Sequence, residues 1–234
     1  MLYQYLRTQI RTSVKLCYPS VELADSTITF AYNHDKNTDL SSPFIFTLAK
    51  KTGIPADSIA KQVMACFYWD EKYVIPDPGL NYTISSGYLN FAISPAYLIE
   101  VVKELTSFDS RIEEEQVALF PEYIQRTLKK GILFIRHTPW PENIQYTNLP
   151  ALLSEKIEHS LLVLLAISEP RELHSSDAAL FLLRTICSTL ENYVKKNAIL
   201  TNDRYITEAR IILFRAVHNR IISLCRFYYP DFRS

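Results

Sequence analysis

Apolar residues recur at steps of three and four from the start of the chain, which is the spacing of one helix face. The residues on this face are Leu2, Leu6, Ile10, Val14 and Cys17. Pro19 follows them, and proline is typical of the region just beyond a helix end. The pattern predicts an amphipathic first helix whose apolar face lies on a core.

Strand and helix patterns then alternate up to about residue 106. Segments rich in β-branched and aromatic residues predict strands, while proline at a start and glycine after an end mark helices. Ser94 and Pro95 are such a start, with Ser94 as the N-cap and Pro95 at the first helical position. The predicted elements are a strand over 26–33, a helix from Pro43 to Gly53, a helix from Ile54 to Tyr68, strands over 73–84 and 87–93, and a helix from Pro95 to Thr106.

The character of the sequence changes between residues 107 and 150. The glutamates at 113–115 open a predicted helix that ends at Gly131, and residues 132–135 are interpreted as a short strand. The many large apolar residues of this segment exclude a disordered linker. We therefore expect 107–150 to be a structured connector.

Residues 151–234 lack strand alternation, and they contain no glycine. Their apolar spacing predicts three helices, over about 151–168, 176–197 and 203–228. The expected buried stripe of the last helix consists of Ile206, Leu213, Val217, Ile221 and Leu224.

Composition narrows the class of protein. Apolar residues make up 48% of the chain and charged residues 21%, which excludes long disorder and a coiled-coil fibre. The 25 basic and 25 acidic residues cancel, so no chain-wide basic field steers the protein to nucleic acid. With only four glycines, the sequence does not favour a glycine-rich loop that cradles phosphates.

The apolar runs and the cysteines bear on location. The first residues lack the apolar core of a signal peptide, and the densest apolar run, 161–167, is too short to cross a membrane. We therefore expect no membrane association. The four cysteines are far apart in sequence and are expected to be core residues in a reducing, cytoplasmic compartment. They are Cys17, Cys66, Cys187 and Cys225.

Two segments of the N-terminal half resemble the additional N-terminal domain of arginyl-tRNA synthetases. They are FIFTLAKKTGIPADSIAKQV (44–63) and SGYLNFAISPAYLIEVVKEL (86–105). Asn90 and Pro95 stand where that family keeps Asn and Pro. The resemblance implies an α+β domain over 1–106, with helices packed on a small antiparallel sheet.

Three later segments resemble the DALR-type anticodon-binding domain of the same family, in the same order. They are EKIEHSLLVLLAISEP (155–170), DAALFLLRTICSTLENYVKKNAIL (177–200) and EARIILFRAVHNRIISLC (208–225). The resemblance implies an all-α helical bundle over 151–234. The connector at 107–150 then replaces the family's catalytic domain, and we expect the two halves to pack directly on each other.

The missing catalytic domain argues against an enzyme. Residues 135–138 (IRHT) are not a HIGH motif, and residues 127–130 (TLKK) are not the family's Lys-Met-Ser-Lys loop. No other nucleophile or nucleotide-binding motif is visible, so we expect no cofactor. Glu155 and His159 share a helix face but have no third ligand nearby in sequence, so we expect no metal.

Basic residues near the C-terminus are candidate contacts for nucleic acid. Between 195 and 234, eight Lys or Arg residues face three acidic ones. Arg204, Arg215 and Arg226 are eleven residues apart, so each step turns the helix by only about 20°. The candidate binding residues are Tyr193 as a stacking ring, Lys195, Lys196, Arg204, Arg215 and Arg226. Arg210 is set apart because an internal salt bridge is equally expected there, and an ordinary basic surface is the alternative for the whole set.

Two functions from different classes fit these observations. One is a non-catalytic tRNA-binding or tRNA-handling protein, implied by the resemblance. The other is a protein-interaction or assembly factor that uses the domains as a scaffold, with a homodimer through exposed tyrosines as one form. Residues 38–42 favour the second function, because they lack the aromatic, Gly and Gln residues of the family's tRNA-elbow stretch. The fifteen tyrosines also favour it, because tyrosine is enriched at interfaces.

Overall fold

The structure is a computed structural model of the chain. It describes residues 1–33, 38–75, 88–107, 114–118, 120–141, 145–173 and 175–229. The chain divides into two compact units, Met1–Tyr97 and Leu98–Ser234. The sequence predicts a boundary after residue 106, whereas the division falls at Tyr97, inside helix α4 (Pro95–Ser107).

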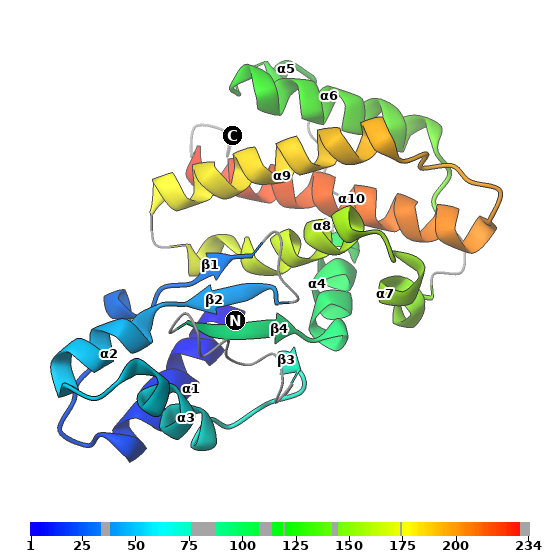
Figure 1. The fold of residues 1–234 in the computed structure, drawn as a ribbon. Helices are drawn as coiled ribbons and strands as arrows, with labels where there is room; N and C mark the ends of the chain where they lie inside the picture. The colour runs from blue at the N-terminus through cyan, green and yellow to red at the C-terminus, as the bar shows by residue number, and fades with distance from the viewer. Residues whose placement is uncertain are drawn as a thin grey trace. The chain divides into compact units, whose positions relative to one another are not determined.

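The strands that the structure describes in the N-terminal unit form one antiparallel sheet in the order β1-β2-β4-β3 (Figure 1). Their bounds are β1 Ala31–Tyr32, β2 Leu40–Ser42, β3 Val74–Ile75 and β4 Leu89–Ile93. The central strand β4 pairs Asn90 with Ser41 of β2 and Ile93 with Val74 of β3. Asn90 is therefore a buried residue of the sheet.

The described part of this unit also contains the helices α1 (Leu2–Cys17), α2 (Phe44–Thr52) and α3 (Ala56–Ala65). Helix α3 packs against both α1 and α2. The predicted apolar face of α1 is confirmed except at Cys17, since Leu2, Leu6, Ile10 and Val14 are buried. Gly53 ends α2 as predicted, with a φ of 72° that suits glycine.

The first predicted strand is shorter than expected. Residues 25–27 form a 3-10 turn (η1), and only Ala31 and Tyr32 pair with β2. The pairing is short because β2 itself has three residues before α2 begins. Of the strand predicted over 73–84, Val74 and Ile75 are observed, and residues 76–87 lie outside the described residues.

The second unit is helical. Beyond α4 its helices are α5 (Glu114–Val117), α6 (Glu122–His137), α7 (Leu149–Leu152), α8 (Lys156–Ile167), α9 (Ser176–Lys196) and α10 (Arg204–Tyr228), with 3-10 turns η3 (Tyr146–Asn148) and η4 (Pro170–Glu172). The helices predicted over 176–197 and 203–228 are confirmed, whereas the region predicted as one helix over 151–168 contains the end of α7 and then α8 from Lys156. An α+β unit followed by an all-α unit is the fold class that the sequence leads us to expect.

Helix α10 is the central element of the helical unit. It packs against α6, α7, α8 and α9, and Figure 1 shows it running beside α9. Between Ala209 and Cys225 nearly all of its residues are buried, so it presents much more than one stripe to the core. Helix α8 is similar, because the whole run Leu161–Ile167 is buried.

The prediction of a helix end at Gly131 and a strand over 132–135 is wrong. Both lie inside α6. A Cβ added to Gly131 would stand 2.4 Å from Cδ2 of His218, so glycine is needed here for the close approach of α6 to α10. Three residues later, close to the same face of α6, the rings of Phe134 and Phe214 join the same two helices with their centroids 4.5 Å apart. The connector segment thus contributes a helix to the core of the second unit.

Candidate nucleic-acid interface

The N-terminal turn of α10 presents an arginine and a tyrosine at the protein surface. Asp203 caps the helix, since its Oδ1 accepts from the backbone N–H groups of Tyr205 at 2.8 Å and Ile206 at 3.1 Å. This cap stabilises the first turn of α10, which carries Arg204 and Tyr205. Tyr205 is 64% exposed, so its ring is available to a ligand.

A groove of about 490 Å³ lies beside this turn, between α10 and the segment that carries η3 and α7. Two amides, Gln145 and Asn148, stand on the η3 side, and Asn148 Nδ2 donates to Gln145 Oε1 at 3.3 Å. The remaining wall combines charged and apolar side chains. The lining residues are Gln145, Asn148, Leu149, Leu152, Arg204, Tyr205, Glu208, Ala209 and Ile212.

Arg204 is oriented by an ion pair within its own helix. Its Nε lies 2.7 Å from Oε1 of Glu208, one turn later. The side chain of Arg204 is 78% exposed, so the pair itself adds little stability. A guanidinium carries five N–H donors, and the bond to Glu208 is made through Nε.

This set of side chains matches the chemistry of a single-stranded nucleic acid. An exposed tyrosine ring stacks on bases, an arginine binds phosphate, and amides read the donor and acceptor groups of base edges. The apolar lining residues Leu149, Leu152 and Ile212 suit the flat face of a base. The groove is therefore the candidate binding site on the described surface.

Tyr193 does not belong to this groove, and the expectation that it is a stacking ring is wrong in this structure. Its side chain has no exposed surface, and its hydroxyl donates to Glu158 Oε1 at 2.9 Å. Burial, followed by the charge of Glu158, raises the pKa of Tyr193. Tyr193 is thus a core residue.

Glu158 is the centre of a buried polar cluster that joins three helices. Its Oε1 also accepts from Nε of Arg210 at 2.7 Å, and its Oε2 accepts from the backbone N–H of Glu155 at 3.1 Å. Arg210 in addition donates through Nη1 to the carbonyl of Ala198 at 2.7 Å. The internal salt bridge considered for Arg210 is therefore present, and Arg210 is not a surface charge.

The proposed arginine stripe is interrupted. Arg215 is half-buried, and its guanidinium carbon lies 4.4 Å from the ring centroid of Trp140, which is a cation–π contact. Arg204 and Arg226 are both exposed, but 22 residues of helix separate them by about 33 Å. The three arginines follow one side of α10 without forming one continuous basic surface.

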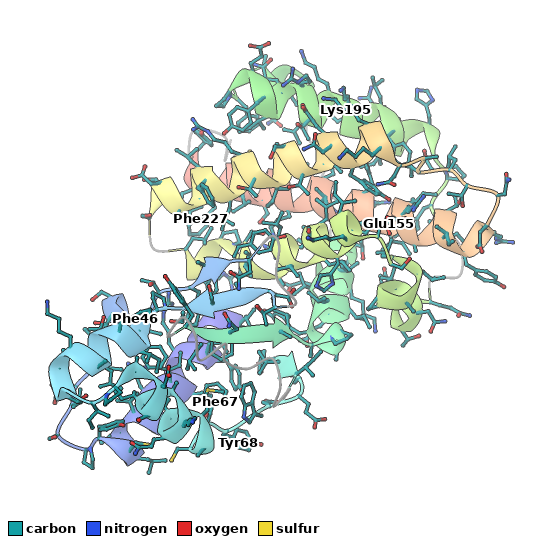
Figure 2. All side chains as sticks on the ribbon, in the orientation of Figure 1. Phe46, Phe67, Tyr68, Glu155, Lys195 and Phe227 are labelled. Carbon is teal, nitrogen blue, oxygen red and sulfur yellow. The ribbon has the colours of Figure 1, made fainter. Side chains whose placement is uncertain are left out.

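The other basic residues also differ in their roles. Lys195 and Lys196 are exposed in the last turn of α9, where positive charge complements the helix dipole (Figure 2 labels Lys195). Arg220 is buried, and its Nη1 lies 3.2 Å from Oε2 of Glu169. Arg233 lies outside the described residues. Only some of the basic residues counted between 195 and 234 are therefore exposed at the surface.

Sequence reasoning missed the η3 side of the groove. Gln145 and Asn148 belong to the segment interpreted as a connector, and no spacing in the sequence relates them to Arg204 or Tyr205. Only the packing of α7 on α10 brings them together. Tyr205 could have been identified as a candidate from the sequence, because it directly follows Arg204 at a helix start that Asp203 caps.

Metal-ligand clusters and membrane-spanning helices are not found in the described residues. Within the described ranges, no three His, Cys, Asp or Glu side chains gather as metal ligands, and no helix is long and apolar enough to cross a membrane. Glu155 and His159 lie at the start of α8, with Glu155 as its N-cap residue (Figure 2). The expectation of core cysteines is confirmed for Cys187 and Cys225 and wrong for the other two.

Comparison of the chain with protein-family models, curated proteins and solved structures finds no match, so the resemblance to arginyl-tRNA synthetases remains a prediction.

Proposed function

We propose that this protein binds tRNA through the groove beside α10 and does not aminoacylate it. The observation that carries the proposal is the grouping of Arg204, the exposed ring of Tyr205 and two amides around one open groove. Each of these groups serves a different part of a nucleotide: phosphate, base face and base edge.

The sequence resemblance supports tRNA binding by the helical unit, although of the groove residues it covers only Glu208, Ala209 and Ile212. The segments that resemble an anticodon-binding domain cover α8, α9 and most of α10, and α10 forms one wall of the groove. The HIGH and Lys-Met-Ser-Lys motifs of the family are missing from the sequence. We infer a tRNA-handling role, such as storage or delivery, in place of amino-acid activation.

The neutral charge of the chain restricts the kind of RNA segment. Without a broad basic field, contacts to bases have to supply much of the affinity. Bases are accessible in single-stranded loops, while a paired RNA helix hides them. We therefore propose an unpaired loop of tRNA as the bound segment.

Fluorescence anisotropy with bulk native tRNA, at about 50 mM and about 200 mM salt, tests this proposal. We expect a submicromolar Kd at the higher salt. Tyr205→Ala should weaken binding roughly tenfold, because one base stack contributes about 1–3 kcal/mol. Tyr205→Phe keeps the ring and should bind as the wild type does. Arg204→Gln should reduce the salt dependence by about one phosphate contact.

Lys129→Gln is the matched control, since Lys129 is an exposed cation of α6 that does not line the groove. A Kd of about 10⁻⁶ M or weaker at both salt concentrations would be ordinary non-specific binding and would refute the proposal. Equal losses for Arg204→Gln and Lys129→Gln would also refute it, because diffuse charge would then explain the affinity.

A protein-interaction role is the second candidate, and one observation in the N-terminal unit favours it. Phe46 and Tyr88 are 44% and 37% exposed, and their rings form an edge-to-face pair with centroids 5.4 Å apart. Figure 2 labels Phe46 on α2. Aromatic residues of this kind are enriched in interfaces. Sedimentation velocity would reveal a homodimer, and Phe46→Ala should dissociate it while Leu133→Ala, an exposed apolar residue of the helical unit, should not.

A further inference from the structure

Two cysteines from separate helices meet at the surface of the N-terminal unit. Cys17 is the last residue of α1, and Cys66 is the C-cap of α3. Their Sγ atoms lie 3.2 Å apart. A disulfide bond is about 2.0 Å long, so a shift of the sulfurs by little more than 1 Å would join them.

The surrounding hydrogen bonds hold the two helix ends in this position. Ser13 Oγ donates to the carbonyl of Cys66 at 3.1 Å, and Cys17 Sγ lies 3.3 Å from the carbonyl of Gln62. The hydroxyl of Tyr18 donates to the side-chain oxygen of Gln62. The Ser13 and Tyr18 bonds involve neither sulfur, so the alignment of the helix ends does not depend on the thiol contact.

Exposure separates this pair from the other cysteines. Cys66 is exposed and Cys17 is partly exposed, whereas Cys187 and Cys225 are buried in the helical unit. A dissolved oxidant therefore reaches Cys66 first, and the buried thiols serve as internal controls. Oxidation of cysteine depends on access as well as on thiolate character.

We propose that Cys17 and Cys66 are a redox-modification site that forms a reversible disulfide when a hydroperoxide is present. The thiolate of Cys66 attacks the peroxide oxygen, which gives a sulfenic acid on Cys66 and water. Cys17 then attacks the sulfenic sulfur, the S–S bond forms, and the second oxygen leaves as water. Two thiols and one hydrogen peroxide thus give one disulfide and two waters, and a dithiol reductant reverses the modification by exchange.

The environment of Cys17 fits the role of the second, resolving thiol. Burial and the hydrogen bond to Cys66 raise the pKa of Cys17 to about 11. Cys17 therefore has the smaller thiolate fraction toward peroxide, which leaves the exposed Cys66 as the first sulfur to be oxidised. The short distance between the sulfurs makes its attack an intramolecular one.

The disulfide would close a loop that contains η1, β1, β2, α2 and α3. A disulfide across a long loop lowers the conformational entropy of the unfolded chain. The melting temperature of the oxidised N-terminal unit should therefore be higher by about 10 °C or more. The modification therefore regulates the thermal stability of this unit.

The experiment uses the full chain, reduced with dithiothreitol, desalted and treated with a small excess of hydrogen peroxide. After alkylation under denaturing conditions, mass spectrometry should find a peptide that links Cys17 to Cys66, with Cys187 and Cys225 alkylated. The melting temperature should rise, and dithiothreitol should restore both readouts.

Single variants separate the two steps. Cys17→Ser should leave the sulfenic acid of Cys66 unresolved, so that a 1,3-dione probe labels it, whereas the wild type should take up little probe. Cys187→Ser should behave as the wild type does, and circular dichroism checks that each variant is folded. A wild-type chain without the Cys17–Cys66 peptide, or with only disulfides between chains, would overturn the proposal.

Discussion

The close approach of Gly131 to His218 predicts that Gly131→Ala lowers stability when His218 is present and raises it when His218 is replaced by alanine. Alanine at position 131 would place its Cβ 2.4 Å from Cδ2 and 3.2 Å from Nε2 of the imidazole. Non-bonded carbon atoms prefer separations of about 3.5–4.0 Å. The imidazole cannot move aside easily, because His218 is buried in the middle of α10.

Two opposing terms set the magnitude for Gly131→Ala. Alanine is favoured over glycine inside a helix by about 1 kcal/mol. Overpacking a well-packed core costs about 1–3 kcal/mol. We therefore expect the free energy of unfolding to fall by up to about 2 kcal/mol. In a His218→Ala background the obstacle is gone, and the same substitution should raise the free energy of unfolding by about 1 kcal/mol.

Chemical denaturation of the wild type, both single variants and the double variant closes a double-mutant cycle. Gly53→Ala is the matched control, since nothing lies within 4 Å of its added Cβ and its cost comes from the positive φ alone. That cost should be the same in both backgrounds. A stabilising Gly131→Ala in the wild type, or a coupling to His218 below about 0.5 kcal/mol, would refute the close-approach explanation of this glycine.

Three further predictions concern the helical unit. Glu158→Gln should lower the free energy of unfolding by about 3 kcal/mol in denaturation, because Arg210 keeps a buried charge without its carboxylate; a loss below about 0.5 kcal/mol would contradict this. Burial lowers the pKa of His218 to about 4, so the unfolded chain binds the proton more tightly than the folded chain does. The free energy of unfolding should therefore fall by about 3 kcal/mol as the pH falls from about 6.5 towards 4. His218→Gln should flatten that pH profile. Trp140→Ala should cost about 1–2 kcal/mol by removing the ring over Arg215, and Trp140→Phe should retain much of the contact, as thermal melting can show.

The helices whose limits depend on local chemistry were predictable from the sequence. The sequence predicts a helix over 203–228 and α10 spans Arg204–Tyr228, because Asp203 caps its first turn and the apolar spacing continues to the end. Gly53 ends α2 for a similar reason, since the conformation it needs is a property of that residue.

The errors came from contacts between residues far apart in the sequence. Gly131 follows the usual rule for a helix end, but the approach of α10 decides its role. Tyr193 stands among basic residues, yet its hydroxyl reaches Glu158, 35 residues earlier. The candidate groove depends on Gln145 and Asn148 meeting α10, and that meeting requires the packing of the whole helical unit. Patterns of period 3.6 or 2 contain no information about such partners.

The central position of α10 also has a consequence for synthesis of the protein. The apolar run Leu161–Ile167 of α8 packs against α10, and α10 leaves the ribosome later because it follows α8 and α9 in the chain. At about 5–20 residues per second, the run waits several seconds for this partner. During that interval it is exposed to other nascent chains. A truncation that removes α10 would make this exposure permanent, so such shortened translation products should be aggregation-prone.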